Sequence, residues 1–323
     1  MANTIKMKVL ANDGISQSGI DALQKAGFEV ITTTVAQNQL ESFINEHTID
    51  AILVRSATQV RQELIDACPS IKLIGRGGVG MDNIDVEYAR NNGLHVINTP
   101  NASSNSVAEL VFAHLFGMVR FLHQSNREMP LEGDTRFKEL KKDFANGTEL
   151  RGKTLGIIGF GRIGKEVAKI ALGIGMKVIA SDAFVGKSSI NVSFYNGQFI
   201  DVEIETQSIT DILKQSDFIT LHVPAQKEYV IGTKQFEEMK DGVGIINAAR
   251  GGVIDEIALV NAIETGKVKY AGLDVFENEP SPEIQLLMNP DISFTPHIGA
   301  ATVEAQDRVG KELATQIIAL LTN

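Results

Sequence analysis

The sequence predicts an α/β protein of two domains, each built on a doubly wound parallel sheet. Short apolar runs alternate with segments of helical spacing along the chain, which is the pattern of βαβ units. The glycine pattern G-x-G-x-x-G occurs twice, each time directly after an apolar run. The 323 residues also suffice for two domains, at roughly 150 residues per domain.

The first predicted sheet takes its strands from the first hundred residues. Its apolar runs lie at residues 8–10, 28–31, 51–54, 71–74 and 94–97. Between them, residues such as Ile20, Leu23 and Ala26 recur at helical spacing. We place the end of this sheet before Pro100.

A long apolar helix is predicted next, at residues 107–122. Apolar side chains such as Val111, Leu115 and Met118 lie around most of the circumference of the helix. A helix of this kind is buried, either in a domain core or at a subunit interface.

The second predicted sheet begins after Gly152. Its strands lie at residues 153–158, 176–180, 218–221, 244–247, 270–273 and 292–294. A hairpin around Asn196-Gly197, at residues 190–204, interrupts the alternation. It could cover the adenosine end of a cofactor, but we interpret it as surface decoration. A last helix follows at residues 304–321, and its pattern does not fix its location.

Composition restricts the kinds of binding partner and the cellular compartment that we expect for the protein. A net charge of −10 and a pI near 5.2 argue against nucleic acid or an anionic membrane as a partner. The single Cys68 excludes an intramolecular disulfide and favours a reducing compartment. No signal segment is visible, and no apolar run approaches ~20 residues. We expect a cytoplasmic protein, and we assign no metal ligands.

The second glycine loop is predicted to bind a dinucleotide. Gly159 permits a tight turn, Gly161 lets the backbone approach a pyrophosphate, and Gly164 lets the following helix pack closely on the strand. The next strand ends at Asp182, close to the roughly 20-residue spacing of a ribose-binding acid. A carboxylate there accepts a hydrogen bond from the ribose 2′-hydroxyl and repels a 2′-phosphate. The cofactor is therefore predicted to be NAD.

The first glycine loop, at residues 75–80, has no such acid. The strand after it runs into Asn98-Thr99-Pro100, where a ribose would need a carboxylate. As regards NAD we interpret this loop as a tight strand–helix turn. Its backbone amides remain a candidate site for a substrate anion.

Three residues with suitable chemistry follow predicted strands of the second sheet, at the carboxyl ends where open α/β sheets bind ligands. These residues are Arg250, Glu279 and His297. A histidine can take the hydroxyl proton during hydride transfer, a neighbouring carboxylate raises the histidine pKa, and an arginine can hold a substrate carboxylate with two hydrogen bonds. Two alternatives remain open: Arg250 could be a surface residue near a turn, and Glu279 could be an ordinary polar residue of a loop. We interpret the histidines in ordinary helix or strand patterns as structural: His47, His95, His114 and His123.

These motifs together resemble the D-isomer-specific 2-hydroxyacid dehydrogenase family over nearly the whole chain. The ordered set is Gly159 to Gly164, Asp182, His222-Val223-Pro224, residues 247–252, Asp274-Val275-Phe276, Glu279-Pro280 and Pro296-His297. Residues 54–58, 75–83, 98–101 and 297–306 most resemble the phosphoglycerate dehydrogenases of that family. The resemblance implies NAD-dependent oxidation of D-3-phosphoglycerate to 3-phosphohydroxypyruvate, in L-serine biosynthesis.

The resemblance also implies residue roles. His297 would be the acid/base, Glu279 its partner, and Arg250 a clamp for the substrate carboxylate and carbonyl. The implied substrate-binding residues are Arg55, Ser56, Arg76, Val79, Gly80 and Asn101, with Arg55 the best candidate for the phosphate. The implied cofactor-binding residues are Gly159, Gly161, Arg162, Ile163, Gly164, Asp182, His222, Val223, Pro224, Ala248, Ala249, Asp274 and Gly299.

The family fold implies a Rossmann NAD-binding domain, residues 101–300, inserted in a flavodoxin-like substrate domain, residues 1–100 and 301–323. The last helix would then return to the first domain, and the apolar helix would lie at the two-fold interface of a homodimer. A further basic residue for the phosphate would be Arg136, Lys141 or Lys142. Because the chain stops at Asn323, we expect no serine-binding regulatory domain.

Two alternatives remain open. A glyoxylate or hydroxypyruvate reductase shares the fold, the cofactor and the Arg-Glu-His set, although Arg55 with Arg76 favours a phosphorylated substrate. A non-catalytic NAD-sensing protein, like the transcriptional co-repressors of this fold, is disfavoured by the acidic charge and by the lack of low-complexity tails.

Overall fold

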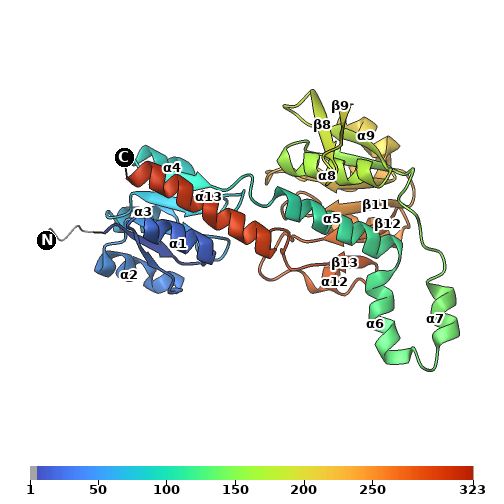
Figure 1. The fold of residues 1–323 in the computed structure, drawn as a ribbon. Helices are drawn as coiled ribbons and strands as arrows, with labels where there is room; N and C mark the ends of the chain where they lie inside the picture. Colours follow the sequence, from blue (N-terminus) through green and yellow to red (C-terminus); the bar gives the residue numbers. More distant parts are fainter. Residues whose placement is uncertain (1–5, 323) are drawn as a thin grey trace. The chain divides into compact units, whose positions relative to one another are not determined.

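The structure, a computed structural model, describes residues 6–322. They form two compact units: the first contains the chain up to Ser104 and again from Ala300, and the second runs from Asn105 to Gly299 (Figure 1). Each unit is built on a parallel sheet with helices on both faces. The predicted fold class is therefore confirmed.

The sheet of the first unit has five parallel strands in the order β2-β1-β3-β4-β5, which is the flavodoxin-like order. The strands are β1 Lys8–Ala11, β2 Glu29–Ile31, β3 Ala51–Val54, β4 Leu73–Arg76 and β5 His95–Asn98. Their positions agree with the five predicted runs. The central strands β1, β3 and β4 are mostly buried, as expected of strands covered on both faces, whereas the edge strand β2 is partly exposed.

Helices cover both faces of this first sheet. They are α1 Gln17–Lys25, the short 3-10 helix η1 Gln37–Gln39, α2 Leu40–His47, α3 Gln62–Ala67, α4 Val86–Asn91 and α13 Val303–Leu321. The last helix, α13, lies beside α1 (Figure 1). A Cβ on Gly19 would lie 2.8 Å from the carbonyl oxygen of Gly310, so two glycines let these helices approach closely. The last helix, whose location the sequence pattern did not fix, thus packs on the first unit.

The sheet of the second unit has six parallel strands in the order β13-β12-β11-β10-β6-β7. The strands are β6 Thr154–Ile158, β7 Lys177–Ser181, β10 Phe218–Leu221, β11 Val243–Asn247, β12 Val268–Leu273 and β13 Ile292–Phe294. The winding reverses between β6 and β10. A crevice for ligands is expected at the carboxyl ends of these two strands.

Helices α5 and α8 contribute to the core on one face of this sheet, and α9, α10 and α11 to the core on the other. The helices are α5 Ser104–Val119, α6 Leu122–Glu132, α7 Phe137–Asp143, α8 Arg162–Gly173, α9 Ile209–Gln215, α10 Thr233–Glu238, α11 Glu256–Glu264 and α12 Ile284–Leu287. Helices α6 and α7 form an arm that projects from the rest of the unit (Figure 1).

The predicted apolar helix at residues 107–122 is wrong at its carboxyl end. Helix α5 ends at Val119, and Phe121 adopts the left-handed conformation with φ 55°, which turns the chain into α6. Seven apolar residues of α5 lie in the core of their own unit: Val107, Ala108, Val111, Phe112, Leu115, Met118 and Val119. Among the described residues no single helix is long and apolar enough to cross a membrane; α5 and α6 reach that length only together, with a bend of 57°.

The predicted hairpin is confirmed as β8 Lys187–Ser193 paired antiparallel with β9 Phe199–Glu205. Gly197 occupies its turn with φ 86°. The interpretation of this hairpin as decoration is wrong, because Ile190 and Ile204 are buried in the same core as α8. One face of the hairpin therefore belongs to the fold of the second unit.

Candidate active site

The glycine loop after β6 has the geometry of a dinucleotide site. Gly159 has φ 93°, and a Cβ on it would lie 2.5 Å from the carbonyl oxygen of His222. A Cβ on Gly164 would lie 2.3 Å from the carbonyl oxygen of Gly159, so α8 packs tightly on the loop. A Cβ on Gly161, by contrast, would meet no atom within 4 Å. The open side of the loop at Gly161 fits an approaching pyrophosphate.

Asp182 lies beside this loop at the end of β7. Its carboxylate accepts hydrogen bonds from three backbone amides, Phe160 at 2.6 Å, Phe184 at 2.8 Å and Val185 at 3.0 Å. These bonds fix the carboxylate next to the glycine loop, where a ribose hydroxyl is expected.

His222 follows β10, on the other side of the switch point. Its backbone amide donates to Ile158, and its Nε2 lies 3.0 Å from the hydroxyl of Thr220. Its Nδ1 is buried and has no hydrogen-bond partner among the described residues. Burial lowers the pKa of His222 to about 3, so the ring is neutral. An orphaned buried nitrogen beside an open glycine loop fits a site that a polar cofactor completes.

The remaining residues predicted to bind the cofactor surround the same strand ends. Arg162 and Ile163 open helix α8, and Ala248 and Ala249 form the buried start of the turn after β11. Val223 packs against the glycine loop, where its side chain would lie 3.0 Å from a Cβ on Gly159. Pro224, which follows Val223, is exposed.

The turn after β11 holds Arg250. The side chain of Asn247 donates to the Arg250 carbonyl at 2.8 Å and accepts from the Ala249 amide at 3.1 Å. A Cβ on Gly251 would lie 1.8 Å from the carbonyl oxygen of Phe276, which no side chain tolerates. Gly251 therefore lets the Arg250 turn contact the segment after β12.

Glu279 and His297 form a hydrogen-bonded pair. His297 Nδ1 lies 2.8 Å from Glu279 Oε2, and the two side chains, His297 and Glu279, are 38% and 34% exposed. Burial raises the pKa of Glu279, but the hydrogen bond from His297, the charge of that ring, the Phe276 amide and the charge of Arg250 together lower it. The ionised carboxylate can only accept, so Nδ1 donates and Nε2 is left for proton transfer. The second unit thus brings together the three residues that the sequence singled out.

Asp274, which the family resemblance assigns to the cofactor, lies in a buried network of hydrogen bonds. It is 1% exposed, and its carboxylate accepts from the Thr295 hydroxyl at 2.6 Å, the Ile298 amide at 2.8 Å and the Gly299 amide at 2.9 Å. The Gly299 carbonyl in turn accepts from Ser106 at 2.7 Å. Asp274 and Gly299, both predicted to bind the cofactor, therefore also support the His297 loop.

Sequence reasoning missed several supporting residues. Thr295 and Ser106 carry no motif that distinguishes them from ordinary turn or cap residues, and Asn247 lies in the motif at residues 247–252 but was given no role. His114 carried the one usable signal, because a polar ring on the apolar helix α5 requires partners.

The residues predicted to bind substrate lie at the carboxyl ends of β3, β4 and β5 in the first unit. The Arg55 amide donates to Asp13 at 2.6 Å, and Val54 pairs with Arg76 in the sheet. Among the described residues, the amides of Val79 and Gly80 donate to no backbone carbonyl. This loop is held by the side chain of Asn98, which donates to the Val79 carbonyl at 2.7 Å. Ser56 and Asn101 are exposed on the loops after β3 and β5.

The candidate basic residues for a phosphate lie at helix α7 of the arm. Arg136 forms ion pairs with Glu132 and, at 2.7 Å, with Glu139. Lys141 and Lys142 are exposed in the last turn of α7.

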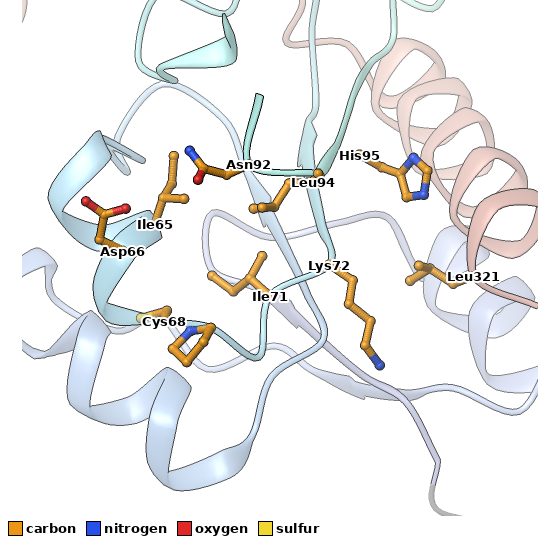
Figure 2. Close-up of a pocket in the computed structure, with 11 residues that line it drawn as sticks. Ile65, Asp66, Cys68, Ile71, Lys72, Asn92, Leu94, His95 and Leu321 are labelled. Atoms are coloured by element: carbon orange, nitrogen blue, oxygen red, sulfur yellow. The ribbon is translucent and has the colours of Figure 1, made fainter. Parts of the chain in front are cut away.

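A separate pocket of about 540 Å³ lies at the opposite, amino ends of β4 and β5 (Figure 2). Lys72, which lines it, is ion-paired with Asp50 at 2.8 Å, and burial raises the pKa of Cys68 to about 11. None of the predicted site residues lines this pocket. It is therefore distinct from the candidate site.

A glycine loop at a doubly wound sheet, with an arginine and a carboxylate–imidazole pair at neighbouring strand ends, defines the class of nicotinamide-dependent dehydrogenases. Residues 112–299 match the family model described as D-isomer specific 2-hydroxyacid dehydrogenase, NAD binding domain. The chain belongs to this family, and its cofactor is NAD.

Individual relatives agree with this assignment. The chain is 43% identical to a D-3-phosphoglycerate dehydrogenase of Archaeoglobus fulgidus, over 97% of this chain and 57% of that protein. It is 42% identical to a hydroxypyruvate reductase of Thermotoga maritima, over 97% of both chains. The crystal structure of an Aquifex aeolicus D-lactate dehydrogenase complexed with NAD and lactic acid superimposes with a TM-score of 0.74, at 30% identity, over 98% of this chain and 95% of that chain. The chain thus spans little more than half the length of the first of these relatives.

Proposed function

We propose that this protein oxidises D-3-phosphoglycerate to 3-phosphohydroxypyruvate with NAD. The proposal is carried by the carboxyl ends of β3 and β4 in the first unit. Arg55 follows β3, Arg76 ends β4, and the next loop has two backbone amides, of Val79 and Gly80, that donate to no backbone carbonyl of the described residues. Two cationic side chains and two amide donors suit a substrate with both a phosphate and a carboxylate. The similarity to D-3-phosphoglycerate dehydrogenases supports the same substrate.

The chemistry would be carried by residues of the second unit. Bound NAD supplies the hydride acceptor. As hydride leaves the substrate carbon, Nε2 of His297 takes the proton of the hydroxyl group, and the ionised Glu279 stabilises the imidazolium through Nδ1. Arg250 holds the substrate carboxylate and polarises the developing carbonyl oxygen. In the reverse direction His297 returns the proton.

We also propose a homodimer formed through the arm of α6 and α7. Three large apolar side chains of the arm are more than half exposed: Leu122 at 63%, Leu131 at 76% and Phe137 at 56%. Exposed apolar patches of this kind mark protein interfaces. A second copy is the occupant that the family resemblance favours, but that resemblance implied an interface on the apolar helix at residues 107–122, whose apolar side chains lie in the core of their own unit. Lys141 and Lys142, on the same arm, remain candidates for a contact with the substrate phosphate.

A hydroxypyruvate reductase is the second candidate function. It is favoured by the Thermotoga maritima relative, which this chain matches over nearly the whole length of both proteins. The two candidates share the proposed proton-transfer residues and differ only in the substrate.

The test is a steady-state assay with NAD or NADH against 3-phosphoglycerate, 3-phosphohydroxypyruvate, hydroxypyruvate and glyoxylate. We expect the highest kcat/KM for the phosphorylated acids. In an Arg55→Gln variant, kcat/KM for 3-phosphohydroxypyruvate should fall by about 10- to 100-fold, because a hydrogen bond to a charged group is lost, while hydroxypyruvate reduction changes little. Arg61→Gln, which breaks an exposed ion pair with Asp85 in the same unit, is the matched control. Preference for the unphosphorylated acids would establish the reductase instead.

A further inference from the structure

The loop that carries His297 is held in an unusual backbone conformation. His297 has φ 52°, in the left-handed region that non-glycine residues seldom occupy. Such a conformation persists only where the surrounding structure fixes it. The contacts that fix this loop therefore decide where the imidazole lies.

Asp274 binds three successive amides of the loop. Its backbone carbonyl accepts from the His297 amide at 2.8 Å. Its carboxylate accepts from the Ile298 amide at 2.8 Å and the Gly299 amide at 2.9 Å. One buried residue thus fixes the backbone at His297 and at the two residues after it.

The Asp274 carboxylate is in turn fixed by a chain of hydrogen bonds that passes through helix α5. The Thr295 hydroxyl donates to Asp274 Oδ1 at 2.6 Å, and His114 Nε2 lies 3.0 Å from that hydroxyl oxygen. His114 is 3% exposed, and its other ring nitrogen, Nδ1, lies 2.9 Å from the Ser293 hydroxyl. A Cβ on Gly272 would lie 3.0 Å from His114 Cβ, so a glycine of β12 makes room for the ring.

The proton positions in this chain follow from its donors and acceptors. Burial lowers the pKa of His114, the charge of His123 adds to this effect, and Asp274 opposes it, so the ring is neutral and carries one N–H. The single hydrogen of Thr295 goes to Asp274, so its oxygen must accept from Nε2–H of His114. Nδ1 then accepts from Ser293. The chain therefore runs in one direction, from Ser293 through His114 and Thr295 to Asp274.

We propose that His114, Thr295 and Asp274 are positioning residues, which hold the His297 loop so that its imidazole meets Glu279 and the substrate hydroxyl. The proposal rests on the proposed function for the identity of the acid/base. It gives a role in catalysis to His114, a residue on a core helix 181 residues away in sequence from the threonine it contacts.

The first measurement is a comparison of four variants by steady-state kinetics. Thr295→Val removes the central hydroxyl at nearly constant volume, and we expect kcat to fall by about 10- to 100-fold, because small misplacements of a reacting group have costs of that order. KM for NAD should stay unchanged. Thr295→Ser and His114→Gln, which retain a hydroxyl and an N–H donor, should recover most of the activity. Thr265→Val, which removes an exposed hydroxyl at the end of α11, is the matched control and should keep kcat within about twofold.

The second measurement does not depend on turnover. In histidine-labelled protein, the NMR signals of the His297 ring are assigned by their loss in His297→Ala. The Nδ1–H proton that His297 donates to Glu279 should give a downfield resonance. Thr295→Val should shift or broaden these signals in protein that melts cooperatively, whereas the control Thr265→Val should leave them in place. His114→Leu serves as the second variant if Thr295→Val does not fold.

Wild-type kcat together with unchanged His297 signals in Thr295→Val would overturn the positioning role. If the wild-type protein turns over none of the 2-hydroxy or 2-keto acids, the proposed function fails. The NMR comparison still decides whether the chain from His114 positions His297.

Discussion

The backbone amide of Phe160, inside the glycine loop, donates a 2.6 Å hydrogen bond to the carboxylate of Asp182 at the end of the next strand. The loop expected to bind the pyrophosphate and the acid expected to bind the ribose are therefore joined directly. Each fixes the position of the other before any cofactor arrives, which reduces the cost of binding.

This relationship predicts the effect of Asp182→Asn on cofactor choice. The variant keeps the size of the side chain but removes the charge that repels a 2′-phosphate. We expect the ratio of kcat/KM for NAD to that for NADP to fall by about tenfold, equivalent to ~1.4 kcal/mol. Asp201→Asn, on the exposed strand β9, is the control. An unchanged ratio would place the ribose contact on another residue.

Two glycines of the same loop should respond oppositely to alanine. Gly161→Ala should keep the free energy of unfolding within about 0.5 kcal/mol, since its Cβ meets no atom within 4 Å, but should weaken NAD binding. Gly164→Ala should destabilise the fold by about 1–3 kcal/mol, because its Cβ would lie 2.3 Å from the Gly159 carbonyl oxygen. Urea unfolding and calorimetric titration with NAD measure the two effects. Equal NAD affinity in Gly161→Ala and wild type would contradict the pyrophosphate assignment.

Removal of the proposed acid/base should separate catalysis from cofactor binding. His297→Ala should lower kcat by about 10²- to 10⁴-fold, the usual contribution of a general acid or base. The Kd for NAD should change little. Glu279→Gln should lower kcat less, because the amide still orients the ring without stabilising its charge. His95→Asn, an exposed histidine of the first unit, is the control. Near-normal turnover in His297→Ala would refute the assignment.

His222 should make the protein less stable in acid. Its pKa is about 3 in the folded state, against 6.5 for an ordinary histidine, so between these values the unfolded chain binds more protons. The free energy of unfolding must then fall as pH falls from 6.5 towards 3, by up to about 1.4 kcal/mol per pH unit from this group. His222→Asn should reduce the slope in urea unfolding between about pH 4.5 and pH 6. Thr220→Val keeps the imidazole and should therefore retain the wild-type slope. Equal slopes in the wild type, His222→Asn and Thr220→Val would contradict the low pKa of His222.

The arm should control the oligomeric state. Leu131→Glu combined with Phe137→Glu places two charges on its exposed apolar face, and we expect the proposed dimer to dissociate to monomers in sedimentation velocity. Ile257→Glu, on α11, alters a side chain that is 78% exposed elsewhere in the second unit and should leave the dimer intact. A double variant that sediments like the wild type would remove the arm from the interface.

The sequence predicted most of the fold because its signals are local. Each strand of both sheets is a short apolar run, and the hairpin follows from one Asn-Gly turn with alternating neighbours. The helix at residues 107–122 was misjudged at its end because the chain stays apolar past Val119, and only the left-handed Phe121 stops the helix. Nothing in the local pattern marks that change of backbone conformation.

The residues of the candidate site also fall into those that the sequence predicted and those that only the structure identified. The sequence by itself predicted the glycine loop and the acid for NAD, and it singled out Arg250, Glu279 and His297, because motif spacing and strand ends can be recognised from the local sequence. Only the tertiary structure decided that Asp274 holds the His297 loop and that His114, 181 residues from Thr295, belongs to the chain of hydrogen bonds behind it. Side-chain partners at such separations depend on how the strands and α5 pack, and no periodicity along the sequence encodes which two polar groups will meet.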